Sequence, residues 1–501
     1  MNLLTLGRLR NLASPVGWLV TRRGALLEQA LRGGVWLFLG DAFTKVAGIL
    51  KIAVLAHLLA PSDFGVMAIA MAVLKGLEFL TETGFSAALI HSRDDVRAYF
   101  DTLWAVQLAR ALALSIALAT AAPLGGWFFA VPEATPVIRA IALVLLLRGL
   151  VNPAVVLLRK DLDFQRVVVW RLGGVVVGLA VGISWALVDA SAWALVASTV
   201  AAQVAETALS YWAVSYRPRL RFEAGRARQL FAYGKWMFWA NVLAFIGMYA
   251  DTMMVGKVLG TGALGFYQMA FELAMLPLTV IGAQVRGVMF PAFSRMTDTA
   301  EQRKSFFLIL GVLSAIVIPL AAFVTVFADG LVAVVLGSRW LPVGPSLRIL
   351  VWGAGAATLS ALVNSLFQAR GRPDLVVKFA LVQIGSWAVS SYPLLIAWGI
   401  GGMAVAVTAS CVLSVLVKLV FVTRLLEARP HAALRAFSVS LAGSLPFVLS
   451  APLARALPPA TPWLVPLAAA GLVAYLAILA AALRYHFDLW PGRGGPLGSA
   501  A

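Results

Sequence analysis

The chain has 501 residues, of which 61% are hydrophobic and only 12% are charged. A soluble globular protein is about one quarter charged and lacks one apolar run after another, so this composition excludes a soluble domain and predicts a polytopic membrane protein. The net charge of +18 would suggest nucleic acid in a soluble protein, but here the basic residues flank apolar runs, which is typical of membrane topology and predicts no nucleic-acid partner.

The first 33 residues hold only short apolar stretches broken by arginines, and they predict a cytoplasmic tail with an interfacial amphipathic helix near residues 26–31. The apolar runs that follow are continuous rather than alternating, which favours helices over a β-barrel. We therefore predict an all-α integral membrane protein with about fourteen transmembrane helices. The predicted spans are 35–58, 62–90, 99–122, 135–158, 167–188, 192–215, 232–257, 262–285, 305–328, 346–369, 375–397, 400–423, 434–454 and 462–484.

Basic residues gather in every second connection of this span pattern. The connection after the sixth span holds Arg217, Arg219 and Arg221, whereas the opposite side holds little beyond Lys257, Arg339 and Arg455. Because basic loops stay in the cytoplasm, this asymmetry predicts that both termini are cytoplasmic.

The first two spans carry six charged residues at membrane depth. These are Asp41, Lys45 and Lys51 on the first span, and Lys75, Glu78 and Glu82 on the second. A charge in hydrocarbon costs between ~2.5 and more than ~10 kcal/mol, so the side chains must face water or one another. They either form neutralising pairs, such as Asp41 with Lys75 or Lys45 with Glu78, or line a polar lumen. We favour the lumen, because intramembrane charges usually mark a substrate or ion path.

Internal similarity indicates a duplication. When Gly65 is placed on Gly265, HLLAPSDFG lies on KVLGTGALG, and three weaker matches follow in order: PVIR with PSLR, LVN at 150–152 with LVN at 362–364, and WALVAS with MAVAVT. Six helices are an even number, so the halves keep one orientation and form two parallel six-helix lobes around a central cavity, followed by two C-terminal helices. The predicted parts are the tail 1–33, the N-lobe 34–216, a cytoplasmic linker 217–231, the C-lobe 232–428, helices 13 and 14 at 429–485, and a flexible tail 486–501.

Further polar residues stand within predicted spans, among them Arg110 and Glu206. Asp251 and Glu272 lie at comparable depth in the second half and predict an acidic surface opposite the cationic first half. Arg148 lies near the end of the fourth span. Lys418 lies near the cytoplasmic end of its span, from which we expect its ammonium to snorkel to the membrane surface.

Several apparent motifs predict no chemistry. GTGALG matches the dinucleotide pattern but joins two membrane helices rather than a strand and a helix. Gly174, Gly178 and Gly182 are typical of close helix packing. The histidines are scattered, and no nucleophile–base pair appears. The sequence therefore predicts no enzyme, no cofactor and no metal site.

Several stretches between residues 30 and 430 resemble the bacterial Wzx-type polysaccharide transporters. Those transporters belong to the multidrug/oligosaccharidyl-lipid/polysaccharide superfamily. The resemblance rests on LLAPSDFGVMAIA (58–70), GFSAALIHSRD (84–94), LDFQR (162–166), YRPRLRF (216–222), ADTMMVGKVLGTGALGFYQMAFELAMLPL (250–278), MFPAFSR (289–295), GSRWLPVGPSLRIL (337–350) and QARGRPDLVVK (368–378).

This resemblance implies a flippase of the bacterial inner membrane. It would move undecaprenyl-diphosphate-linked oligosaccharide repeat units outward by alternating access, for O-antigen, capsule or exopolysaccharide synthesis, alongside a polysaccharide polymerase and glycosyltransferases. From charge and depth, we expect the diphosphate to be bound by Lys45, Lys51, Lys75 and Arg148. We expect the empty lumen to be kept neutral, or a coupling proton or cation to be bound, by Asp41, Glu78, Asp251 and Glu272. The alternatives are a cation-coupled multidrug exporter of the same superfamily and a polyprenyl-phosphate glycosyltransferase or ligase.

Overall fold

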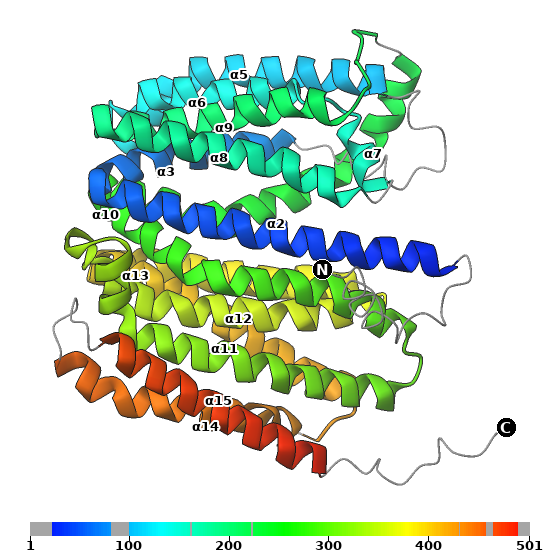
Figure 1. The fold of residues 1–501 in the computed structure, drawn as a ribbon, viewed down its shortest axis with the longest axis vertical. Helices are drawn as coiled ribbons and strands as arrows, with labels where there is room; N and C mark the ends of the chain where they lie inside the picture. Colours follow the sequence, from blue (N-terminus) through cyan, green and yellow to red (C-terminus); the bar gives the residue numbers. More distant parts are fainter. Residues whose placement is uncertain are drawn as a thin grey trace, which may run out of the picture. The chain divides into compact units, whose positions relative to one another are not determined.

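The computed structural model describes residues 23–81, 100–160, 163–221, 224–429, 431–456 and 464–488. Within these ranges all regular structure is helical (Figure 1). The chain divides into two compact units. Unit 1 comprises Met1–Leu59, Val73–Trp127 and Pro132–Phe245, and unit 2 comprises Ala60–Ala72, Phe128–Val131 and Ile246–Ala501. The predicted lobe boundaries remain a prediction.

The helices follow the predicted spans in chain order. They are α2 (Arg23–Leu58), α3 (Pro61–Thr81), α5 (Phe100–Phe129), α6 (Ala134–Gly149), α7 (Val155–Lys160), α8 (Phe164–Val188), α9 (Ala192–Ala213), α10 (Ala224–Arg295), α11 (Thr299–Val335), α12 (Val343–Ala369), α13 (Pro373–Leu425), α14 (His431–Ala456) and α15 (Leu464–Asp488). Two of them, α10 and α13, each cover two predicted spans. Gly260 (φ 79°) and Gly399 (φ 57°) interrupt them in the left-handed region that glycine tolerates.

Eight helices in the described ranges are long and apolar enough to cross a membrane. They include α5, α8, α9, α11, α12 and α13, but not α2 and α3, which carry the charges of the predicted lumen. The structure therefore supports a multi-pass membrane protein without fixing the predicted number of fourteen spans.

The fourth predicted span is wrong at its C-terminal end. Instead of running to residue 158, α6 ends at Gly149, and the chain breaks before the short helix α7 begins at Val155. Pro153 disfavours a helix at this point, and Asn152 stabilises the break: its side chain accepts a hydrogen bond from Ala154 N (3.0 Å) and donates one to Tyr216 O (2.7 Å). Its repeat partner Asn364 lies inside the unbroken α12, where its Oδ1 is buried without a partner among the described residues.

In unit 1, α8 and α9 pack closely side by side (Figure 1). A Cβ added to Gly174 would lie 2.9 Å from Ala202 O, and one added to Gly178 would lie 2.8 Å from Ser198 O. The predicted packing role of this glycine ridge is thus confirmed, because larger side chains would push the two backbones apart.

The core of unit 2 is formed by the end of α10 together with α11, α12 and α13. Phe293, Phe306 and Phe367 are fully buried in it, and the Phe367 and Phe379 rings stack with centroids 5.6 Å apart. This rigid aromatic core holds α12 and α13 together around the polar groups described below.

Candidate functional site

Unit 1 contains a cluster of charged and polar side chains contributed by three helices. Glu78 on α3 accepts hydrogen bonds from Lys75 Nζ (2.8 Å) one turn earlier and from the Arg148 guanidinium of α6. Arg148 Nε also donates to Gln203 Oε1 on α9, at 3.1 Å. The Lys75, Glu78 and Arg148 side chains are 25%, 18% and 38% exposed. The charges are thus paired, yet they stay accessible from outside the protein, as a site for a polar ligand requires.

The end of α6 is fixed to α9, which holds Arg148 in place. Thr207 Oγ1 donates to Leu147 O (2.9 Å), and Tyr211 OH donates to Leu150 O (2.7 Å). Leu147 O also accepts from Leu150 N at 3.1 Å, so the two side-chain bonds reinforce the last turn of α6 and the residue that follows it. Arg148 therefore stands on a helix end whose position is determined by its neighbours on both sides.

A second carboxylate extends the cluster along α9. Glu206 is within electrostatic range of Arg171 on α8 and of Arg148. Its backbone carbonyl accepts a hydrogen bond of 2.6 Å from Trp170 Nε1, which ties α8 to the same turn of α9. The cluster, defined as Lys75, Glu78, Arg148, Arg171, Gln203 and Glu206, thus combines three cationic and two anionic groups.

The three predicted residues of α2 also belong to unit 1. Asp41 is exposed, whereas Lys45 and Lys51 are half-buried. Lys75 pairs with Glu78 and not with Asp41, so the first of the two cross-helix pairs that we considered is not formed; the second, Lys45 with Glu78, stays a prediction. Glu82 lies outside the described residues.

Sequence reasoning missed Gln203 and Arg171 as members of the cluster. The signal was a polar stripe on the sixth span, because Gln203, Glu206, Thr207 and Ser210 recur at the spacing of one helix face. Such a stripe inside an apolar span marks the side that faces polar partners.

In unit 2, Asp251 lies inside the protein. It is 7% exposed and accepts hydrogen bonds from Tyr267 OH (2.6 Å) and Thr252 N (2.7 Å). Glu272 is instead exposed and accepts from Gln268 Nε2 at 3.2 Å. The two carboxylates that we predicted on one acidic surface therefore occupy different environments.

Lys418 does not snorkel, and that expectation is wrong. It is 3% exposed, and its Nζ donates to Ser360 Oγ on α12 at 2.6 Å. Close by on α13, Gln383 Nε2 donates to Cys411 Sγ at 3.4 Å. Unit 2 thus holds a buried amine where the sequence suggested a surface charge.

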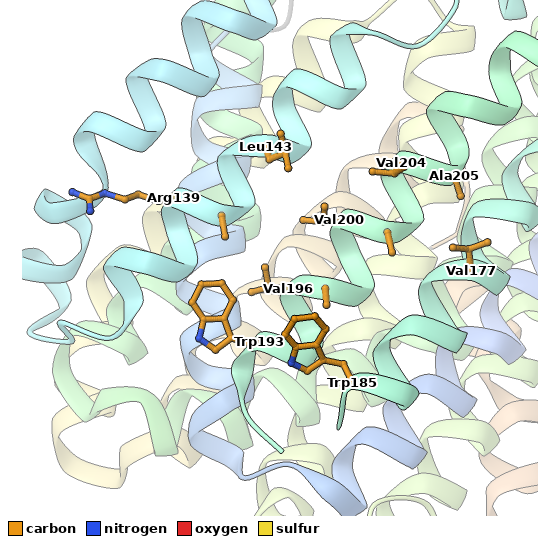
Figure 2. Close-up of a pocket in the computed structure, with 12 residues that line it drawn as sticks. Arg139, Leu143, Val177, Trp185, Trp193, Val196, Val200, Val204 and Ala205 are labelled. Carbon is orange, nitrogen blue, oxygen red and sulfur yellow. The ribbon is translucent and has the colours of Figure 1, made fainter. Parts of the chain in front are cut away.

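An apolar groove lies on another face of unit 1, between α6, α8 and α9 (Figure 2). Its only charged lining residue, Arg139, directs its guanidinium away from the groove and donates from Nε to Ala119 O at 3.4 Å. The groove is therefore unsuited to a charged group. In the described ranges, no group of three or more His, Cys, Asp or Glu residues is placed to hold a metal ion.

The sequence matches a family of known proteins over more than half of its length. The family model described as "Polysaccharide biosynthesis protein" matches residues 54–345. Similar curated proteins include the lipopolysaccharide biosynthesis protein WzxC of Escherichia coli, 21% identical over 71% of this chain and 73% of that protein. Another is the succinoglycan biosynthesis transport protein ExoT of Rhizobium meliloti, 24% identical over 70% of this chain and 71% of that protein.

Solved structures share the fold at low sequence identity. A lipid II flippase MurJ in an inward closed conformation aligns with a TM-score of 0.72, covering 91% of this chain and 100% of that one at 14% identity. An inward-facing multidrug resistance transporter of the MATE family aligns with a TM-score of 0.55, covering 78% and 94% at 16% identity. These likenesses establish an all-helical transporter fold.

Proposed function

Because the chain belongs to the polysaccharide biosynthesis protein family, we propose that it is a flippase that moves lipid-linked oligosaccharide repeat units across a membrane. The substrate class would be an undecaprenyl diphosphate carrying a sugar repeat unit. The product would serve the synthesis of a polysaccharide such as O-antigen, capsule or exopolysaccharide. The protein would carry this lipid without changing its covalent structure.

The observation that carries this proposal is the cluster on α3, α6, α8 and α9. A diphosphate that leaves water loses its hydration, and guanidinium and ammonium groups replace that hydration with charge-assisted hydrogen bonds. Lys75 and Arg148 already share one carboxylate, Glu78, with part of each side chain exposed. An arriving diphosphate would compete with Glu78 for both cations.

The site residues divide into two roles. Lys45, Lys51, Lys75 and Arg148 would contact the diphosphate. Asp41 and Glu78 would balance the cations in the absence of substrate. In unit 2, Asp251 and Glu272 would bind a coupling proton or cation, and the buried hydrogen bond from Tyr267 would make Asp251 the more selective of the two.

The cellular setting follows from the same premise. The protein would lie in the bacterial inner membrane with both termini in the cytoplasm, receive its substrate from glycosyltransferases and supply a polysaccharide polymerase. Alternating access would require the predicted lobes 34–216 and 232–428 to move against each other. The linker 217–231 and the helices at 429–485 would accommodate that motion.

Reconstitution tests the proposal directly. Purified protein in proteoliposomes should move a fluorescent undecaprenyl-diphosphate oligosaccharide to the opposite leaflet, where an added lectin or glycosidase reaches it. Arg148→Gln should abolish this movement while insertion and thermal stability are kept. Wild-type movement in Arg148→Gln would contradict the proposal, as would equal transport of a cationic dye, which the multidrug alternative requires.

A further inference from the structure

We infer that the segment that follows α9, residues 214–221, binds the headgroups of anionic phospholipids at the membrane surface. This segment, the strap, belongs to unit 1 and runs beside the beginning of α5 (Figure 1). Its contacts with the lipid come from Arg219, Leu220 and Arg221. The ligand is a lipid of the surrounding bilayer and not the transported substrate, so this site is additional to the proposed function.

The length of α9 places the strap at the level of the lipid headgroups. This helix has 22 residues and extends over about 33 Å, which matches the ~30 Å hydrocarbon core of a bilayer. Trp193 and Trp212 lie near its two ends, and both indoles are exposed. Exposed tryptophans at the ends of a membrane-crossing helix are typical of the headgroup level. Because Val214 follows α9 directly, the strap begins at that level.

The tip of the strap presents a leucine between two arginines. Arg221 N donates to Arg219 O at 2.8 Å, which closes a tight turn around Leu220. The Leu220 side chain is 72% exposed, and the arginines that precede and follow it are exposed as well. In water this apolar surface stays hydrated, whereas in the interfacial region of a bilayer it is buried. The two guanidinium groups beside it then meet lipid phosphates, which arginine binds with paired hydrogen bonds.

Hydrogen bonds to the helices of unit 1 hold the strap in this position. Asp101 Oδ1 at the start of α5 accepts from Tyr216 OH (2.6 Å) and from Arg219 N (2.8 Å). Asn152 Nδ2 donates to Tyr216 O (2.7 Å), which joins the strap to the break after α6. The Phe100 and Tyr216 rings pack edge to face with their centroids 5.3 Å apart. The turn is therefore formed before a lipid arrives, and binding does not have to order it.

The charge around the turn selects an anionic lipid. Residues 214–228 contain five arginines and one glutamate. Within the described ranges, Arg219 and Arg221 form no ion pair, and the one Asp101 carboxylate is within electrostatic range of both. The guanidinium of Arg217 instead bonds carbonyls of the strap itself. Two arginines thus keep an excess of positive charge for an external anion, and each arginine near an anionic membrane surface strengthens binding about fivefold.

Native mass spectrometry of the full-length protein tests the inference with two lipids of the same acyl chains, anionic phosphatidylglycerol and zwitterionic phosphatidylethanolamine. The double variant Arg219→Gln with Arg221→Gln should weaken phosphatidylglycerol binding about tenfold and leave phosphatidylethanolamine binding unchanged. The matched control, Arg424→Gln with Arg429→Gln, removes two exposed arginines from unit 2 and should bind as wild type. Wild-type binding by the first double variant would overturn the assignment, as would an equal loss in the control, because total charge alone would then explain it.

The depth of the turn gives a second readout. The chain has one cysteine, Cys411, so Leu220→Cys in a Cys411→Ala background carries a single thiol for a fluorescent label. In phosphatidylglycerol liposomes, a nitroxide on the lipid headgroup should quench this label more strongly than iodide in the water. Stronger quenching by iodide would place the turn in water and refute lipid binding. Neither measurement involves transport, so a negative result here leaves the proposed flippase function standing.

Discussion

Gly65 and Gly265 make the same contact in opposite directions. A Cβ on Gly65 would lie 1.9 Å from Thr261 O, and a Cβ on Gly265 would lie 1.8 Å from Pro61 O. Thr261 follows Pro61 by the same 200 residues that separate the two glycines. The repeat register found in the sequence is therefore a reciprocal contact in unit 2, of the kind that a two-fold axis produces.

Replacing either glycine should destabilise unit 2. Gly65→Ala or Gly265→Ala places a methyl group on a backbone carbonyl that cannot move like a side chain, which should cost about 1–3 kcal/mol or more. Thermal unfolding in detergent measures this cost. Gly262→Ala is the matched control, because a Cβ there meets nothing within 4 Å. A loss of stability in the control equal to that in Gly65→Ala would contradict the argument.

A double variant that exchanges the charges of Lys75 and Glu78 on α3 should not transport like the wild type. In the double variant Lys75→Glu with Glu78→Lys, the ion pair within the helix is kept. The lysine introduced at position 78, however, faces the Arg148 guanidinium, which bonds to Glu78 in the unchanged protein. Like charges at hydrogen-bonding distance repel. The flipping assay described above measures the outcome, and adding Arg148→Glu should relieve the repulsion and restore thermal stability but not transport, because it removes the guanidinium that would bind the diphosphate. Full activity of the double variant alone would show that Arg148 and Glu78 do not interact in the working protein.

The fork geometry of Arg148 should matter as well as its charge. Arg148→Lys keeps the positive charge but cannot bond Glu78 and Gln203 together as the guanidinium does. We expect Arg148→Lys to reduce transport by weakening the affinity for substrate, with less effect on expression. Transport in proteoliposomes at several substrate concentrations measures the affinity. Arg217→Gln is the control, since Arg217 bonds only carbonyls of its own loop, Val214 O and Tyr216 O. Equal transport by Arg148→Lys and wild type would mean that charge alone suffices.

Ser360→Ala should lower the stability of the protein more than Lys418→Met. Removing the hydroxyl leaves the buried Lys418 amine without the partner 2.6 Å away, which should cost about 1–3 kcal/mol. Lys418→Met replaces the amine with an apolar chain of similar length and should be neutral or stabilising. Thermal midpoints of both variants give the order. The reverse order would show that the ammonium itself stabilises unit 2.

The bond between Tyr216 and Asp101 should hold over the whole physiological pH range. Burial, followed by the hydrogen bond to the Asp101 carboxylate, raises the pKa of Tyr216 to about 12. A folded pKa above the unfolded value near ~10 means that the stabilisation is complete below pH ~10 and is lost as the pH rises toward 12. Tyr216→Phe should lower stability by about 1 kcal/mol at pH 7. The difference between the two proteins should shrink in unfolding measurements above pH 10.

Sequence patterns predicted the helices well because apolar length and glycine breaks are local properties. The interruptions at Gly260 and Gly399 fall between predicted spans, and the glycine ridge of α8 packs as expected. The early end of α6 had a local signal, Pro153, which the predicted span overlooked; the bond from Asn152 to Tyr216, 64 residues further along the chain, could not be read from the sequence.

The candidate site was predicted in part. Lys75, Glu78 and Arg148 were recognised as charges at membrane depth, and the structure brings them together. Depth along a helix gives no direction around it, so the burial of Asp251 and Lys418 inside unit 2 could not be read from position alone. Gln203 was missed because a neutral amide adds little to a hydropathy profile.

Asn152 and Asn364 occupy matching places in the duplicated sequence but have diverged in use. At the end of α6 the Asn152 amide anchors a distant loop, whereas Asn364 lies within an unbroken helix and its oxygen has no partner among the described residues. The two predicted repeats thus place the same residue in different local structures, so an exchange of the segments around Asn152 and Asn364 would not conserve the contacts of either.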